Sequence, residues 1–309
     1  MKKNFFLLII SLIIVISLIE YSLRIYGLGY PIIYDSSLLW GYNPSPNQKS
    51  KRLKNAIVTI NSEGLRTGKK FSNPKKIIFY GDSVTYGGSY IDDDDIFSEI
   101  TCKKLNEIKE LYSCGNAGVN AYGIKNIIKR IYNYEKKIPS HQIIITIIEA
   151  NFYRNFSQIN SHPFFTKQIQ GPLKATTELI LYVIDKIRNN LRFTAIKKHN
   201  NEKIYFNNIE ILESVNQLVN FYKDQKKKNI SIKIIWSPSL KDFSNNKIKY
   251  NKTEILNLLK KEIKDDFIEI GFLIENLNID ITKIYYDEIH LSKFGHGVYG
   301  EIISKIISD

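Results

Sequence analysis

One stretch of the chain, Gln142 to Ile148 (QIIITII), leaves few choices of fold. Its apolar, β-branched residues are typical of a strand that is buried on both faces, as in parallel sheets covered by helices. Similar patterns predict strands at 77–80, 111–114 and 230–236, alternating with helices at 95–110, 123–136, 173–191, 209–228, 253–264 and 292–308. This alternation predicts an α/β fold with a central parallel sheet and a site at the carboxyl ends of its strands.

The N-terminus combines two lysines with a long apolar stretch. The uncharged run Phe5 to Ile19 follows them, and Glu20 and Arg24 have the i, i+4 spacing that allows pairing at a membrane interface. No small-x-small cleavage site follows, which favours an uncleaved transmembrane helix over residues 1–24. A cleaved signal peptide is the alternative. The position of the lysines predicts that the rest of the chain lies outside the cytoplasm.

The remaining chain divides into two parts. Residues 25–75 are rich in turn-forming residues, so we expect a mostly irregular connector with one short strand at 56–61. Residues 76–309 then form the main domain, with an insertion at about 152–205 where regular patterns are weak.

The charge of the chain is spread out. Lys and Arg number 44 against 31 Asp and Glu, a net charge of +13, but the lysines lie in small groups beside apolar runs. The Ile, Lys and Asn-rich composition is typical of an AT-rich genome, and no nucleic-acid-binding motif accompanies it. We therefore expect no nucleic-acid partner.

Cysteines and acidic residues give little indication of a bound metal. Cys102 and Cys114 are the only cysteines, so they can form one disulfide or remain two buried thiols. Asp92 to Asp95 could bind a cation, but they precede a predicted helix whose dipole they complement. We expect neither a metal nor another cofactor.

A candidate nucleophile follows the first predicted strand of the main domain. The segment Gly81 to Gly87 (GDSVTYG) places Ser83 on a tight turn at the carboxyl end of this strand. The helix start beyond it offers backbone N–H groups to a developing oxyanion. The segment lacks the glycine and lysine pattern of a phosphate-binding loop. An ordinary turn is the alternative interpretation.

A candidate base lies just before the last predicted helix. Asp287 precedes His290 by three residues, and of the five histidines (His141, His162, His199, His290, His296) only His290 has an Asp at this spacing. The carboxylate can accept a hydrogen bond from Nδ1–H, which leaves Nε2 to take a proton from Ser83. A histidine that merely packs at the helix start is the alternative.

Together these segments resemble the SGNH (GDSL-like) hydrolase family over roughly residues 56–308. The first block is matched by Gly81-Asp82-Ser83 with Thr85 and Gly87, the second by Asn116 to Gly123 (NAGVNAYG) and the last by Asp287 with His290. Asn61 to Arg66 (NSEGLR) is similar to the lead-in of membrane-anchored bacterial members from surface-polysaccharide contexts. The resemblance implies a three-layer αβα, flavodoxin-like sandwich. It also implies Ser83 as nucleophile, His290 as general base and Asp287 as the acid that orients it.

The resemblance further implies an oxyanion hole made by the Ser83 N–H, a backbone N–H of the second block and an Asn side chain of the third. Ala121 stands where many members have Gly, which is acceptable if its φ is negative. The third block, usually Gly-x-Asn-Asp, reads Glu149-Ala150-Asn151-Phe152, so Asn151 aligns with the family's Asn. A polar cap at the strand end is the alternative role for Asn151. For Glu149 a salt bridge is favoured over a place in the pocket.

Four aromatic residues near these blocks are candidates for substrate binding: Tyr86, Tyr122, Tyr153 and Trp236. Each tyrosine could stack on a sugar, although packing in the core is the favoured alternative. Trp236 ends a predicted strand on the side of the site.

These features predict a bacterial, single-pass membrane serine esterase with its catalytic domain outside the cytoplasm. Its expected substrate is an O-acetyl or other short O-acyl ester on a cell-surface glycan. An O-acyltransferase on the same glycans would use the same acyl-enzyme, and a lipase or thioesterase also fits. The irregular third block favours a non-enzyme alternative, a degenerate SGNH domain that binds glycan or scaffolds an assembly.

Overall fold

The structure, a computed structural model, describes residues 2–37, 40–107, 111–154, 165–166, 174–199, 208–250 and 253–308. At its centre lies a parallel sheet with the strand order β12-β9-β7-β5-β6. Its strands are β5 (Lys75–Gly81), β6 (Tyr112–Asn116), β7 (Gln142–Ile147), β9 (Ser231–Trp236) and β12 (Phe267–Glu269). The chain leaves the first strand, β5, toward one edge and returns to β7 on its other side, which is the doubly wound, flavodoxin-like order. The predicted α/β fold with a central parallel sheet is therefore confirmed.

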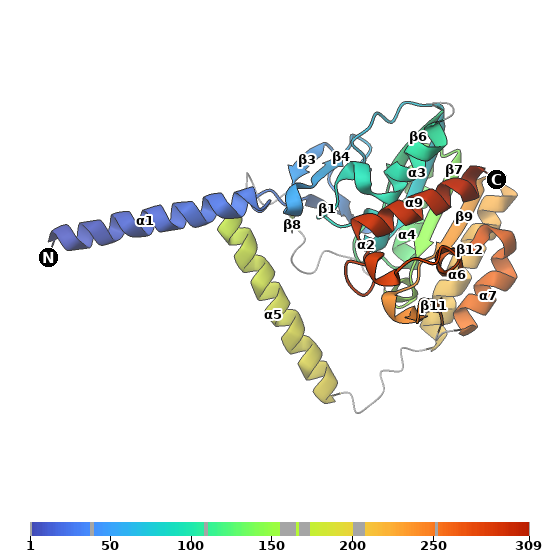
Figure 1. The fold of residues 1–309 in the computed structure, drawn as a ribbon. Coiled ribbons are helices and arrows are strands. Elements are labelled where there is room, and N and C mark those ends of the chain that lie inside the picture. The colour runs from blue at the N-terminus through green and yellow to red at the C-terminus, as the bar shows by residue number, and fades with distance from the viewer. Residues whose placement is uncertain are drawn as a thin grey trace.

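Helices cover both faces of the sheet (Figure 1). One apolar cluster joins the sheet to α3 (Phe97–Asn106), α8 (Ile270–Glu275) and α9 (Lys293–Ser308). A second cluster joins the opposite face to α4 (Ile124–Glu135), α6 (Asn208–Lys227) and α7 (Thr253–Ile263). Every residue of β7 is buried, because this strand lies in the middle of the sheet between the two clusters.

The segment between residues 25 and 75 is more regular than the sequence predicts. It contains β1 (Ile33–Ser37), β2 (Gly41–Pro44), β3 (Gln48–Lys51), η1 (Leu53–Asn55) and β4 (Ile57–Ile60). β1 pairs with β2 and with β8 (Phe165–Thr166), while β3 pairs with β4. Val58 and Ile60 are buried in the main core, so this segment is packed against the domain and is not a loose connector. Strands of four or five residues separated by Pro and Asn are too short to give a clear periodicity.

Two helices project from the domain (Figure 1). α1 (Lys2–Ile25) contains the stretch Asn4–Ile25, which is long and apolar enough to cross a membrane and is not buried in the structure. The predicted pairing of Glu20 with Arg24 is present at 2.9 Å. α5 (Ala175–His199) begins beside the C-terminal end of α1. The parts of the predicted insertion at 155–164, 167–173 and 200–205 lie outside the described residues.

The remaining elements are short. They are α2 (Ser83–Tyr86), η2 (Asp93–Asp95), η3 (Glu149–Phe152), η4 (Leu240–Asp242), β10 (Phe243–Ser244), β11 (Lys247–Ile248), η5 (Lys264–Asp266) and η6 (Ile281–Lys283). Cys102 on α3 and Cys114 on β6 are joined by a disulfide, with their Cα atoms 5.7 Å apart. Of the two alternatives open from the sequence, the structure has the bonded pair.

Candidate active site

Ser83 is the first residue of α2, directly beyond the carboxyl end of β5. Asp82 caps this short helix, because its Oδ1 accepts a hydrogen bond from the Val84 N–H at 3.0 Å. Gly81 is required before it, since a Cβ there would lie 2.0 Å from Thr85 Oγ1 and 2.5 Å from the Thr146 carbonyl oxygen. The tight turn therefore places Ser83 at the carboxyl end of β5 beside its partner β7, which is the switch point of the sheet, because the strand order reverses between these two strands.

His290 and Asp287 reach Ser83 from the segment before α9. His290 Nε2 lies 2.9 Å from Ser83 Oγ, and His290 Nδ1 lies 2.7 Å from Asp287 Oδ2. Asp287 Oδ1 accepts from the backbone N–H groups of Ile289 and His290. Partial burial alone would raise the pKa of Asp287, but these N–H groups and the His290 ring together lower it below its ordinary value. Asp287 is thus an ionised acceptor that holds the imidazole toward Ser83.

Among the hydrogen bonds of the described residues, none gives an acceptor to the backbone N–H group of Ser83 or to that of Ala121. Ser83 supplies the first free N–H of α2, which is where a helix attracts negative charge. Ala121 has φ +63°, so it lies in the left-handed region and does not have the negative φ that would suit alanine. The backbone of the second block is therefore held in a conformation that glycine would adopt at lower cost.

Asn151 is fully buried and lies at the centre of a polar network that includes Asp82, the neighbour of Ser83. Its Nδ2 donates to Asp82 Oδ2 at 3.1 Å and to the Tyr122 carbonyl oxygen at 2.8 Å, while its Oδ1 accepts from the Ile148 N–H. Both amide hydrogens are therefore engaged. Asn151 would have to give up one of these bonds to donate to an oxyanion, and in this arrangement it positions Asp82 and the second block.

Arg154 is a site residue that the sequence analysis missed. Its Nη1 lies 2.9 Å from Asp82 Oδ2, and Asp82 is almost fully buried. Arg154 therefore neutralises the carboxylate that caps the helix of Ser83. The sequence signal was weak, because Arg154 follows the third block at a position for which the family resemblance assigns no role.

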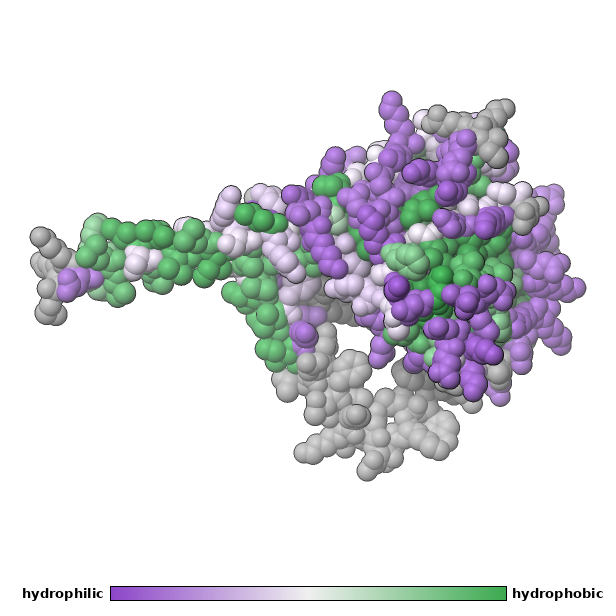
Figure 2. Space-filling model, viewed as in Figure 1, coloured by the Kyte–Doolittle hydropathy of each residue, from purple (hydrophilic) through white to green (hydrophobic). Residues whose placement is uncertain are grey.

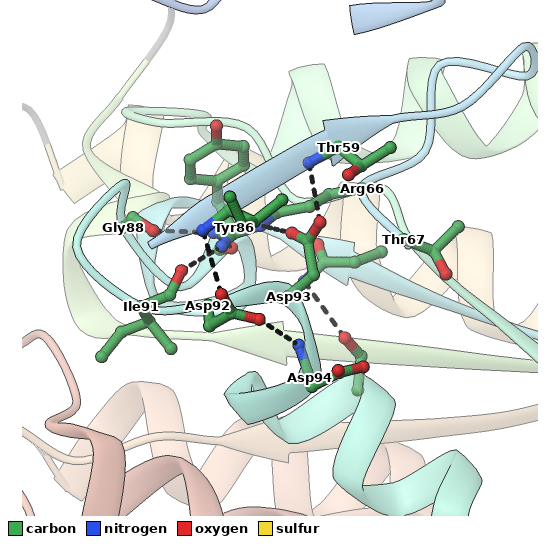
Figure 3. A network of polar contacts seen from close by, with 12 residues as sticks. Thr59, Arg66, Thr67, Tyr86, Gly88, Ile91, Asp92, Asp93 and Asp94 are labelled. Atoms are coloured by element: carbon green, nitrogen blue, oxygen red, sulfur yellow. Dashed lines mark hydrogen bonds and ion pairs between the residues drawn. The ribbon is translucent and has the colours of Figure 1, made fainter. Parts of the chain in front are cut away.

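A second missed residue, Arg66, fixes the loop beyond α2 (Figure 3). It donates to the carbonyl oxygens of Tyr86 (2.8 Å), Gly88 (2.7 Å) and Ile91 (2.5 Å) and forms a buried ion pair with Asp93 at 3.0 Å. One side chain thus ties four points of the chain together. In a lysine-rich sequence, an arginine within a motif indicates a specific structural role, because its planar guanidinium can donate to several buried acceptors at once.

The acidic run Asp92 to Asp95 is bonded within the protein (Figure 3). Asp92 accepts from the N–H groups of Ile57 and Asp94, and Asp93 accepts from the Thr59 N–H at 2.7 Å. In the part of the chain that the structure describes, no group of three or more His, Cys, Asp or Glu side chains could hold a metal ion.

The four aromatic candidates separate into two pairs. Tyr86 and Tyr122 are buried, Tyr86 beneath the Arg66 guanidinium and Tyr122 against Tyr42, so neither ring is open to a sugar. Tyr153 and Trp236 line one cavity of about 200 Å³, although Trp236 is itself buried with its ring stacked on Phe152. Ile289, the neighbour of His290, lines the same cavity, whereas Ser83, Asp287 and His290 are not among its lining residues.

Glu149 also lines this cavity. From the sequence, a salt bridge was favoured for this residue over a place in the pocket. Its Oε1 accepts from the Tyr153 hydroxyl at 3.0 Å. Lys241 and Asp242 complete the charged part of the wall. The cavity therefore combines an indole ring with several hydrogen-bonding groups, a lining suited to a small polar ligand.

Neither protein-family models nor curated proteins match the chain. Solved structures do, among them a variant of an acetyl xylan esterase from Geobacillus stearothermophilus, with 12% identity and a TM-score of 0.48 over 77% of this chain and 97% of that one. An alpha/beta hydrolase from the metagenome of Lake Arreo, Spain, has 10% identity and a TM-score of 0.48 over 77% and 97%. The acetyl xylan esterase AlAXEase has 13% identity and a TM-score of 0.45 over 75% and 98%. Similarity at this level does not transfer an activity.

Proposed function

We propose that this chain is a membrane-anchored serine esterase of the SGNH type. The observation that carries the proposal is the continuous set of hydrogen bonds from Ser83 Oγ through His290 to Asp287, at the carboxyl edge of a doubly wound sheet. A hydroxyl, an imidazole and a carboxylate in this order form the arrangement that generates a serine nucleophile.

In the proposed reaction Ser83 Oγ attacks the ester carbonyl carbon while its proton passes to His290 Nε2. The Ser83 and Ala121 N–H groups stabilise the oxyanion, and Asp287 stabilises the imidazolium. The bond to the leaving alcohol then breaks, and His290 gives its proton to the alcohol oxygen. Water attacks the acyl-Ser83 with His290 again as base, which releases the carboxylic acid and restores the serine hydroxyl.

The proposed substrate is a short O-acyl ester, most simply O-acetyl, on a glycan at the cell surface. The cavity lined by Ile289, the neighbour of His290, supports a polar substrate, because Glu149, Lys241 and Asp242 can bond to hydroxyl groups. At about 200 Å³ it suits a single small unit better than a long acyl chain.

The proposed location of the catalytic domain is outside the cytoplasm, with α1 as the anchor. Two features support it. The exposed, apolar α1 suits a bilayer, and the Cys102–Cys114 disulfide suits an oxidising compartment.

Fluorophosphonate labelling of the full-length protein tests the nucleophile. We expect an adduct on Ser83 in the wild type, none in Ser83→Ala, and full labelling of Ser62→Ala, in which an exposed serine is changed as the control. Acetate release from acetylated glycans should follow the same pattern. Mass analysis of the glycans separates hydrolysis from transfer to a second sugar, and the absence of any adduct on folded wild type would support a degenerate binding domain instead.

A further inference from the structure

One face of α5 is apolar and exposed. Its side chains are Leu179, Ile180, Val183, Ile184 and Ile187, which are between 40% and 56% exposed. Their spacing places them on one side of the helix at 3.6 residues per turn. Figure 2 shows that the apolar surface at the start of α5 continues into the apolar surface of α1. We call these five residues the α5 stripe.

The start of α5 is bonded to the C-terminal part of α1. The Glu20 carboxylate accepts from the N–H groups of Ala175 (2.8 Å) and Thr176 (3.0 Å) and from the Thr176 hydroxyl (3.0 Å). A residue of α1 thus acts as the N-terminal cap of α5. The first turn of α5 therefore lies at the level of Glu20 along α1.

A buried ion pair then fixes α5 to the domain. Arg52, directly after β3, donates to both carboxylate oxygens of Glu178, and Glu178 also accepts from the Gly29 N–H. Neither side chain of the pair is accessible to water. The end of α1, the start of α5 and the domain consequently meet in one joint, so α5 has a defined direction relative to α1.

Side chains at this joint are of the kinds that gather at a membrane surface. Tyr21, Tyr26 and Tyr30 are all exposed, and Arg24 lies over the Tyr30 ring at 5.1 Å. Tyrosines and charged residues at one end of an apolar helix are typical of the boundary between lipid and water. If α1 spans a bilayer, its headgroup region lies beside the first turn of α5.

We infer that α5 lies in the lipid–water interface and buries the α5 stripe among the acyl chains of the leaflet that α1 exits. This inference rests on the anchoring of α1 in the proposed function. Lys186 and Arg188 are exposed and border the stripe on its two sides, where they can reach anionic headgroups. A bilayer is the occupant that fits, because the apolar surface of α1 already requires lipid at the point where the stripe begins.

Spin-label accessibility in the full-length protein tests the inference. Ile184→Cys carries a nitroxide in nanodiscs that contain phosphatidylglycerol and one protein copy, with the native disulfide left oxidised. We expect collision with oxygen to exceed collision with a water-soluble nickel chelate. Ile14→Cys on α1 is the lipid reference, and Leu273→Cys on α8, which is exposed on the domain, is the water reference.

The outcomes separate the two proposals. Nickel access at position 184 equal to that at 273, with position 14 in lipid, would overturn the interfacial role of α5 alone. Nickel access at position 14 would overturn the anchoring of α1. Shielding of position 184 only in discs with two copies would assign the stripe to a protein–protein contact and also overturn the inference.

Charge reversal gives an independent test. Lys186→Glu with Arg188→Glu should raise nickel access at position 184 in phosphatidylglycerol discs and have a smaller effect in phosphatidylcholine discs. Lys129→Glu, an exposed lysine on α4, is the matched control and should change nothing. Equal access in the double variant and the control would contradict a headgroup contact.

Discussion

Arg154 Nη1 lies 2.9 Å from Oδ2 of Asp82, the residue immediately before the candidate nucleophile Ser83. The other carboxylate oxygen of Asp82 caps α2. An arginine beyond β7 therefore holds the cap of the helix that begins at Ser83, and it links the first and third sequence blocks across the sheet.

Replacement of Arg154 with Ala should weaken both the fold and the site. The buried Asp82 carboxylate would then keep the Asn151 amide as its remaining side-chain partner. We expect the free energy of unfolding to fall by about 2 kcal/mol, less than for a fully buried ion pair, because Arg154 is partly exposed. We expect kcat for 4-nitrophenyl acetate to fall about tenfold with little change in KM, because the orientation of Ser83 suffers rather than substrate binding. Arg154→Lys should recover part of both losses. Wild-type stability and kcat in Arg154→Ala would contradict this role.

Replacement of Asp287 with Asn should reduce kcat by about 10⁴-fold with little loss of stability. The amide keeps the shape of the side chain but favours the wrong tautomer of His290. Glu288→Gln, an exposed neighbour, is the matched control and should retain activity. The pKa of Asp287 is lowered, so its carboxylate should stay ionised at pH values at which an ordinary aspartate is protonated. Protonation of Asp287 should therefore not cause a loss of activity in that pH range. A similar kcat for both variants would reject Asp287 as the partner of His290.

Replacement of Ala121 with Gly should keep the activity and leave stability unchanged or higher by up to about 1 kcal/mol. The left-handed φ of +63° costs alanine more than glycine, which offsets the greater chain entropy of glycine in the unfolded state. Ala56, with φ −61°, is the control, and Ala56→Gly should lower stability by about 0.5–1 kcal/mol or more. Thermal unfolding of both variants measures the difference, and equal losses would show that the φ of Ala121 carries no strain.

Replacement of Glu99 with Gln should change how stability depends on pH. Burial raises the pKa of Glu99 from 4.5 to about 7, so between these values the folded state binds more protons than the unfolded state. The wild type should therefore lose stability as pH rises through this range, on the order of 3 kcal/mol, and Glu99→Gln should not. We expect the variant to have a higher Tm than the wild type at pH 8 and a similar Tm at pH 4. Glu107→Gln, a half-exposed residue just beyond α3, is the control. Parallel pH profiles would contradict the raised pKa.

The sequence predicted the main strands and helices because they have clear periodicity. The strand predicted at 142–148 is β7 (Gln142–Ile147), and the helix predicted at 209–228 is α6 (Asn208–Lys227). β12 was missed, since Phe267–Glu269 is too short to produce a pattern and its pairing with β9 is a long-range event. Among the strands before residue 61, the one predicted at 56–61 is β4 (Ile57–Ile60), whereas β1, β2 and β3 were missed for the same reason.

The residues of the candidate site that the sequence predicted are those that lie within a recognisable motif. Ser83, Asp287 and His290 are local to two motifs, and the sheet order brings those motifs together. The roles of Asn151 and Arg154 depend on the buried Asp82 carboxylate, a shared partner that is distant in the sequence. The sequence indicates that such polar residues exist, but only the packed fold decides which acceptors they meet.

The Arg52–Glu178 joint has a consequence for how far the catalytic domain can travel. A domain on a flexible tether would sweep a volume above the bilayer, whereas this joint leaves no free linker between the end of α1 and the folded chain at Gly29. With α1 embedded in a bilayer, Ser83 would remain at a constant distance from the membrane surface. Its substrate would then have to be delivered to that height, as a polymer lying along the membrane or a chain emerging from it would be.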